Sequence, residues 1–190
     1  LIISIGTPVD KNLNPKLNDF LNFFKNIKNI INKNQIVIIR SSIYPGTCNR
    51  IIKILGKKFK NIAYCPERIV QGQAIKELPK LPQIVSGFSN VAVKSASILF
   101  KTICRKILVT KVLEAELIKL FSNAWRYVHF SIANQFHMIC ENYDLDFVRV
   151  RNLMVDGYER NKNIPKAGFA AGPCLLKDTM QLSSFVKKKF

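Results

Sequence analysis

The sequence predicts an α/β fold: a parallel sheet covered by helices on both faces, followed by a long helix and a further helical region. In the first half, short apolar runs without polar/apolar alternation are separated by amphipathic helical segments. This pattern is typical of parallel strands that are buried on both faces. From residue 113 onward the apolar residues recur at helical spacing and the short runs cease.

The sheet region alternates strands and helices. The second predicted helix follows the Tyr-Pro-Gly turn at 44–46, and a long loop is expected over 66–82. The predicted strands are residues 1–5, 36–39, 61–65, 83–86 and 106–109, and the predicted helices are 17–31, 47–55 and 91–100.

Residues 113–141 predict one long helix with an apolar stripe and further apolar side chains elsewhere around its circumference. Such a helix needs cover on more than one side, so we expect it to form a homodimer interface as well. Helices are also predicted at 147–154 and 175–185. We therefore expect residues 1–110 to form the sheet domain and residues 111–190 a helical dimerisation and catalytic domain.

The composition is that of a globular protein, with 48% hydrophobic and 22% charged residues and a formal net charge of +18. The lysines are spread along the chain. The aromatic residues mostly fall on apolar faces and do not alternate with basic ones as a stacking platform would need, so nucleic acid is not an expected partner. No run of ~18 apolar residues suggests a membrane span. The five cysteines are scattered and contain no C-x-x-C, which favours a reducing, cytoplasmic setting without disulfides or a metal site. The chain opens directly in an apolar strand, so we expect an internal fragment.

Residues 172–178, Gly-Pro-Cys-Leu-Leu-Lys-Asp, are the strongest chemical signal. Gly and Pro suit the start of a helix, so Cys174 lies in a first turn, where free N–H groups and the helix dipole favour a thiolate. Lys177 and Asp178 follow at i+3 and i+4 and share its face. A buried structural cysteine is the alternative interpretation. On the long helix, Lys119 and Asn123 are four residues apart and also share a face.

Five segments, in order and spacing, resemble the UDP-glucose/GDP-mannose dehydrogenase family, and the resemblance covers essentially the whole chain. They are Gly-Thr-Pro at 6–8, Arg-Ser-Ser-Ile-Tyr-Pro-Gly-Thr at 40–47, Tyr-Cys-Pro-Glu-Arg at 64–68, Glu-Ala-Glu-Leu-Ile-Lys-Leu-Phe-Ser-Asn-Ala at 114–124 and Gly-Phe-Ala-Ala-Gly-Pro-Cys-Leu-Leu-Lys-Asp at 168–178.

The resemblance implies an NAD-dependent, four-electron oxidation of a nucleotide-sugar C6 alcohol to a uronic acid, which supplies polysaccharide precursors. It implies that Cys174 is the nucleophile that forms a thiohemiacetal and then a thioester. Lys119 and Asn123 match residues that stabilise developing negative charge. Asp178 matches a carboxylate that positions a water, and Glu67 an acidic residue used in thioester hydrolysis.

The resemblance also implies cofactor-binding roles for Thr7, Pro8, Ser42 and Lys177, the first three at carboxyl ends of strands. Ser42 stands where relatives commonly have Thr, and Gln71 where some have a second glutamate. No G-x-G-x-x-G is present. In the resemblance, residues 1–110 are therefore the later part of a Rossmann-like NAD-binding domain. Its first unit and the UDP-binding C-terminal domain are expected outside this chain.

Two other functions remain open. A β-hydroxyacid-type dehydrogenase shares the Lys-x-x-x-Asn pair but needs no cysteine, so Cys174 discriminates against it. A non-catalytic dimerisation module would use the 113–141 helix alone. The substrate is expected to be a UDP-sugar, and residues 64–68 and 167–174 look more like the UDP-N-acetylhexosamine branch than the UDP-glucose branch.

Overall fold

A computed structural model describes residues 1–190 except 8, 13, 57–58, 71, 170–171 and 188–190. The chain divides into two compact units, Leu1–Leu120 with Met180–Phe190, and Phe121–Thr179. We call them the sheet unit and the helical unit. Within the described residues, no helix is long and apolar enough to span a membrane.

The sheet unit contains a five-stranded sheet in which neighbours in sequence are neighbours in space. Its strands are β1 (Ile2–Ile3), β2 (Val37–Ile39), β3 (Ile62–Tyr64), β4 (Gln83–Gly87) and β5 (Ile107–Val109). All pairs are parallel except β3–β4, which is antiparallel with Ala63 opposite Gly87. The expectation of an all-parallel sheet was therefore wrong at this pair. After β3 the chain runs through residues 65–82 and re-enters the sheet at the edge where it left. Without a crossover to the opposite edge, β4 must run antiparallel to β3.

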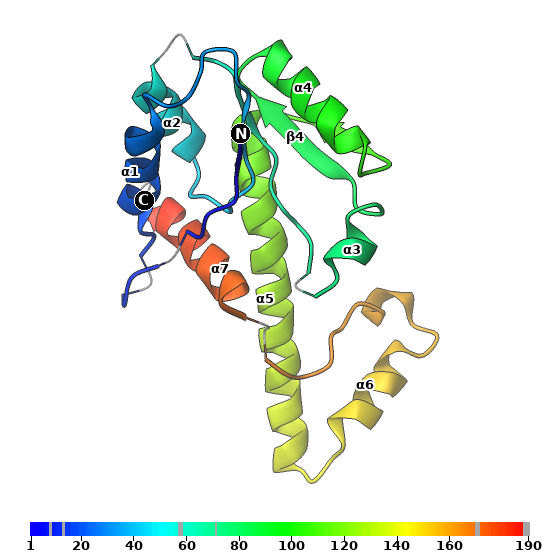
Figure 1. Cartoon of the computed structure of the whole chain (residues 1–190). Helices are drawn as coiled ribbons and strands as arrows, with labels where there is room; N and C mark the ends of the chain where they lie inside the picture. The colour runs from blue at the N-terminus through cyan, green and yellow to red at the C-terminus, as the bar shows by residue number, and fades with distance from the viewer. Residues whose placement is uncertain (8, 13, 57–58, 71, 170–171, 188–190) are drawn as a thin grey trace. The chain divides into compact units, whose positions relative to one another are not determined.

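Both faces of this sheet are covered, as expected. The helices of the sheet unit are α1 (Leu17–Ile27), α2 (Thr47–Leu55), α3 (Ala74–Glu77) and α4 (Asn90–Lys101) (Figure 1). Alternate residues of β2 face opposite sides: Val37 and Ile39 pack in the cluster that holds α1 and α2, whereas Ile38 packs in the cluster that holds α4. This explains why the strands show no polar alternation. The first helix is shorter than predicted, and α3 was not predicted.

In the helical unit, the long predicted helix is one element, α5 (Val112–Asn142), of which residues 121–142 lie in this unit. It is followed by α6 (Phe147–Val155), the short 3₁₀ helix η1 (Glu159–Asn161) and the first half of α7 (Gly172–Lys187). Asp146 caps α6 by accepting a hydrogen bond from the N–H of Val148 at 2.8 Å. The Asn134 side chain holds Gly168 by two hydrogen bonds, of 2.9 and 2.8 Å, to its carbonyl and its N–H.

Candidate functional site

The helical unit brings together three of the expected site residues. The Asn123 side-chain amide donates a hydrogen bond of 2.6 Å to Asp178 Oδ2. Lys177 Nζ lies 3.0 Å from Asp178 Oδ1, and the Asp178 side chain is fully buried. A buried carboxylate is stable when a cation and hydrogen-bond donors compensate it, and this one has both. Lys177, expected to bind the cofactor, is held by Asp178.

Cys174 lies in the first turn of α7, one turn before this buried carboxylate. It is exposed, whereas the other four cysteines are buried and all five are free thiols. Burial raises the pKa of Cys65 to about 12. Burial and the nearby Glu116 raise the pKa of Cys48 well above its ordinary value. Cys174 is therefore the cysteine that a reagent or substrate can reach.

In the sheet unit, Thr7 and Ser42 meet at the carboxyl edge, beyond β1 and β2. The Thr7 hydroxyl donates a hydrogen bond to the Ser42 carbonyl, and the neighbouring Ser41 hydroxyl donates one of 2.6 Å to the Ile5 carbonyl. A Cβ added at Gly6 would meet nothing within 4 Å, so the edge beside Thr7 is open. Pro8, the third residue expected to contact the cofactor here, lies outside the described residues.

Glu116 is a buried acidic residue that the sequence argument missed. Its carboxylate accepts hydrogen bonds from the N–H groups of Gly46 at 2.6 Å and Cys48 at 3.0 Å, at the start of α2. Gly46 has φ +85°, a conformation that favours glycine. Burial raises the pKa of the Glu116 carboxyl, although the two backbone donors act in the opposite direction. Lys119, half-buried, follows one turn later on α5. The sequence signal that could have indicated Glu116 is its position three residues before the candidate lysine, Lys119, on the same predicted helix.

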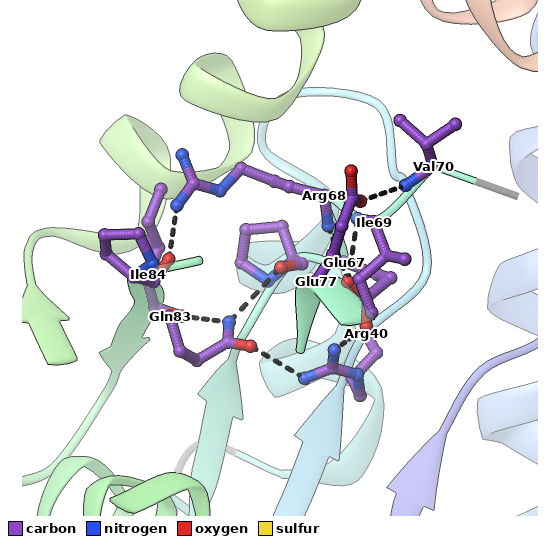
Figure 2. Close-up of polar contacts among 10 residues, drawn as sticks. Arg40, Glu67, Arg68, Ile69, Val70, Glu77, Gln83 and Ile84 are labelled. Atoms are coloured by element: carbon purple, nitrogen blue, oxygen red, sulfur yellow. Dashed lines mark hydrogen bonds and ion pairs between the residues drawn. The ribbon is translucent and has the colours of Figure 1, made fainter. Parts of the chain in front are cut away.

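Glu67 lies just after β3 inside a polar network (Figure 2). Its Oε1 accepts hydrogen bonds from the N–H groups of Arg68 at 2.8 Å and Ile69 at 3.0 Å. Its Oε2 forms an ion pair with Arg40. Gln83 Oε1 accepts a hydrogen bond of 3.1 Å from Arg40. Neither Arg40 nor Gln83 was expected at the site, because predicting their meeting requires the β3–β4 reversal.

Gln181 is a second buried polar residue that the sequence did not indicate. It is 1% exposed, and its Oε1 has no hydrogen-bond partner among the described residues. It lines a cavity of about 10 Å³, beside Thr7 and Tyr44 in the sheet unit. Such a space holds about one water molecule, which would satisfy the Gln181 oxygen.

Comparison with known proteins matches residues 1–108 and residues 113–189 to two domain models of the same family. Residues 1–108 match the model of the UDP-glucose/GDP-mannose dehydrogenase family, NAD binding domain. Residues 113–189 match the central domain of the same family. The expected cofactor, NAD, agrees with the description of the first model.

Similar individual proteins include the UDP-N-acetyl-D-mannosamine dehydrogenase of Pyrococcus horikoshii. It is 28% identical over 198 residues, covering 100% of this chain and 47% of the relative. The UDP-glucose 6-dehydrogenase of Rickettsia bellii is 30% identical over 203 residues, covering 100% of this chain and 45% of the relative. The chain thus spans about half the length of these relatives.

Solved structures agree. The UDP-D-ManNAc dehydrogenase of P. horikoshii superposes with a TM-score of 0.87 at 28% identity, over 100% of this chain and 47% of that one. The UDP-glucose dehydrogenase of Pyrobaculum islandicum shares the fold, with a TM-score of 0.80 at 21% identity, over 99% of this chain and 46% of that one. From the two model matches, the chain belongs to the UDP-glucose/GDP-mannose dehydrogenase family.

Proposed function

We propose that this chain carries catalytic groups for the NAD-dependent oxidation of a nucleotide-sugar C6 alcohol to a uronic acid. The observation that carries the proposal is the exposed thiol of Cys174, one turn before the buried Asp178 carboxylate that Asn123 and Lys177 hold. The membership of both regions in one dehydrogenase family supports it. A β-hydroxyacid dehydrogenase would need no such thiol.

The sheet unit offers a fit for part of the cofactor. Thr7 and Ser42 lie at the carboxyl ends of neighbouring parallel strands, where doubly wound sheets bind dinucleotides, and the space beside Gly6 is open. The sequence contains no glycine-rich phosphate turn. These residues would therefore hold a part of NAD other than its pyrophosphate. When bound, NAD accepts the hydride in each of the two oxidations.

Cys174 acts between the two oxidations. After the first, its thiolate adds to the aldehyde carbon and forms a C–S bond. Loss of a hydride and a proton from this thiohemiacetal gives a thioester. Water then adds to the carbonyl carbon, the C–S bond breaks, and the thiolate leaves with the electron pair.

The other site residues act on charge and protons. The Lys119 ammonium stabilises negative charge that develops on the substrate oxygen, and Asn123 shares this face of α5. Asp178 orients the water that removes the alcohol proton. Glu67 accepts the proton of the water that releases the product.

The test is a chimera in which residues 1–190 replace the stretch of the P. horikoshii relative that they match. It is supplied with NAD and either UDP-N-acetyl-D-mannosamine or UDP-glucose. We expect uronate and two NADH for each sugar oxidised. Cys174→Ser should abolish uronate formation, because a hydroxyl lacks the acidity of a thiol, whereas Cys140→Ala, a buried control, should leave it. A folded chimera that oxidises neither sugar, or uronate from Cys174→Ser, would contradict the proposal.

The substrate is proposed to be a UDP-sugar of the N-acetylhexosamine type, with the uronate serving polysaccharide synthesis in the cytoplasm. The P. horikoshii protein is named for UDP-N-acetyl-D-mannosamine, and the R. bellii protein for UDP-glucose. The relative kcat/KM of the chimera for the two sugars decides between them.

A homodimer through the long helix is the proposed assembly. In the helical unit, one face of α5 exposes apolar side chains at spacings of three and four residues. They are Phe121, Trp125, Val128, Ile132, Phe136 and Ile139. Exposed apolar stripes of this kind are typical of interfaces. Sedimentation of the chain should show a dimer that Val128→Glu dissociates, whereas Arg126→Glu, exposed on another face of α5, should not; a wild-type monomer would contradict the dimer.

A further inference from the structure

We propose that Arg40 is a positioning residue for Glu67, and that its guanidinium keeps that carboxylate oriented and ionised at the carboxyl edge of the sheet. The inference rests on the proposed function, because it concerns how Glu67 takes the proton of the hydrolytic water. It assigns Arg40 a role that acts through the Glu67 carboxylate.

The fold brings three side chains from three neighbouring strands to one place. Arg40 directly follows β2, and Glu67 lies three residues beyond β3. Because β4 runs antiparallel to β3, its first residue, Gln83, lies at this same edge. Figure 2 shows Arg40 between Gln83 and Glu67.

Three side chains, those of Gln83, Glu67 and Phe100, contact the Arg40 guanidinium. One guanidinium nitrogen donates to Gln83 Oε1 at 3.1 Å, and the other pairs with Glu67 Oε2. The guanidinium lies 4.7 Å from the ring centroid of Phe100, and the side chain is 11% exposed. Only a planar fork with separate donors can join both oxygens while it stacks on a ring. A lysine would supply the charge without this geometry.

Glu67 keeps capacity for a further partner. Three interactions hold its carboxylate: the N–H groups of Arg68 and Ile69 on Oε1, and Arg40 on Oε2. An ionised carboxylate has about four acceptor positions, and this side chain is 38% exposed. A water molecule can therefore reach it from solvent. The adjacent cation and the backbone donors all stabilise its negative charge.

One thiol beside Arg40 carries no charge that would compensate the guanidinium. Cys65 is buried, and its pKa of about 12 keeps it neutral at physiological pH. Cys104 is also buried and lines a cavity of about 10 Å³ together with Glu67. Burial lowers the pKa of the Arg40 guanidinium from its ordinary value, but it remains a cation.

Two other charged side chains of the loop make contacts away from this pair. The Arg68 guanidinium donates to the Pro82 carbonyl. The Glu77 carboxylate accepts a hydrogen bond of 2.8 Å from the N–H of Val70. In the part of the chain that the structure describes, Arg40 is thus the cation whose side chain pairs with Glu67.

The consequence for the reaction is a pH effect. To release the product, the water oxygen bonds to the thioester carbonyl carbon, Glu67 takes the water proton, and the C–S bond breaks with its electrons on sulfur. Glu67 must be ionised to accept that proton. Loss of the Arg40 charge removes stabilisation of the carboxylate, so Glu67 becomes protonated at higher pH.

The first experiment follows the carboxyl ¹³C resonance of Glu67 in the 190-residue chain as a function of pH. Glu67→Gln identifies the resonance by its loss. Arg40→Met should move its titration midpoint upward by about one pH unit, whereas Arg40→Lys should restore most of it. Arg68→Met is the matched control, since it removes a cation that holds the same loop without pairing with Glu67. Equal shifts for the two Met variants, or no shift for Arg40→Met, would overturn the inference.

The second experiment measures the chimera. Arg40→Met should move the acidic limb of the kcat profile to higher pH by a similar amount, with KM for the sugar little changed and the first NADH still formed. Arg40→Gln carries the same test if Arg40→Met does not fold, because it removes the charge but keeps a donor. A wild-type chimera that forms no uronate contradicts the proposed function. An active chimera whose neutral Arg40 variant keeps the wild-type limb contradicts only the role of Arg40.

Discussion

The two units of the molecule each place a cysteine, a carboxylate and a cation close together, but with opposite burial. In the sheet unit, Cys65 is buried and the Glu67 side chain is 38% exposed. In the helical unit, Cys174 is exposed and the Asp178 side chain is fully buried. The same three residue types therefore serve different chemistry: in one region the carboxylate is accessible, and in the other the thiol is.

The cations differ in the same sense. Arg40 uses its fork to join Glu67 to Gln83 and so orients a carboxylate that solvent can reach. Lys177 acts as a point charge on a carboxylate whose second oxygen is already fixed by an amide. Orientation is needed where the carboxylate is free to move, and charge compensation where it is buried.

The largest expected effect concerns the two thiols. At about pH 8 in native buffer, a maleimide should label Cys174 at least ~100-fold faster than Cys65, whose thiolate is scarce and inaccessible. Peptide mass mapping after timed quenching measures both rates. In urea the two should label at similar rates, which is the control. Equal native rates would remove the contrast between the regions.

Next in size is the loss of the buried carboxylate. Asp178→Ala should lower the free energy of unfolding by about 3 kcal/mol, because it removes the buried carboxylate that the Lys177 ammonium and the Asn123 amide both contact. Urea unfolding followed by circular dichroism and by the fluorescence of Trp125, the only tryptophan and a residue of the helical unit, measures this. A loss below about 1 kcal/mol would mean that the cluster is not a stabilising element.

The corresponding change in the sheet unit should be milder. Glu67→Ala should cost about 1 kcal/mol, because Arg40 retains Gln83 and the freed N–H groups of the loop can bind water. The same unfolding experiment gives the difference from Asp178→Ala directly. Equal costs for the two substitutions would show that exposure does not distinguish these carboxylates.

The smallest effect involves a third carboxylate, Glu116, which is held by backbone donors. Its pKa is raised by burial, so folding favours its protonated form. The contribution of Glu116 to stability is therefore greatest at a pH below the ordinary glutamate pKa of 4.5. It declines as the pH rises through the pKa of the folded state. Relative to Glu116→Gln, wild type should lose stability as the pH rises from about 4.5 towards neutrality. A constant difference across that range would contradict the shift.

Local sequence signals were sufficient for most of the architecture. The apolar runs predicted all five strands, and α2 begins and ends at the predicted residues, Thr47 and Leu55, after its Tyr-Pro-Gly turn. Helical spacing likewise predicted that Lys177 and Asp178 follow Cys174 on one helix. These features depend on periodicity and turn chemistry, which a single segment contains.

The polar partners were beyond such reasoning, because they join distant segments. Gln83 and Arg40 are 43 residues apart and meet only because β4 is reversed. Glu116 reaches the N–H groups of Gly46 and Cys48 across 70 and 68 residues. Strand direction and packing between elements set these contacts, and neither leaves a periodic pattern in the sequence.

The β3–β4 reversal also determines where the chain tolerates changes in length. A crossover connection between parallel strands must run back along the full length of the strands, which sets its minimum length. The 65–82 excursion starts and ends at one edge, and lengthening such a loop costs little free energy. Insertions or deletions there leave the strand register intact while they reshape the rim around Glu67.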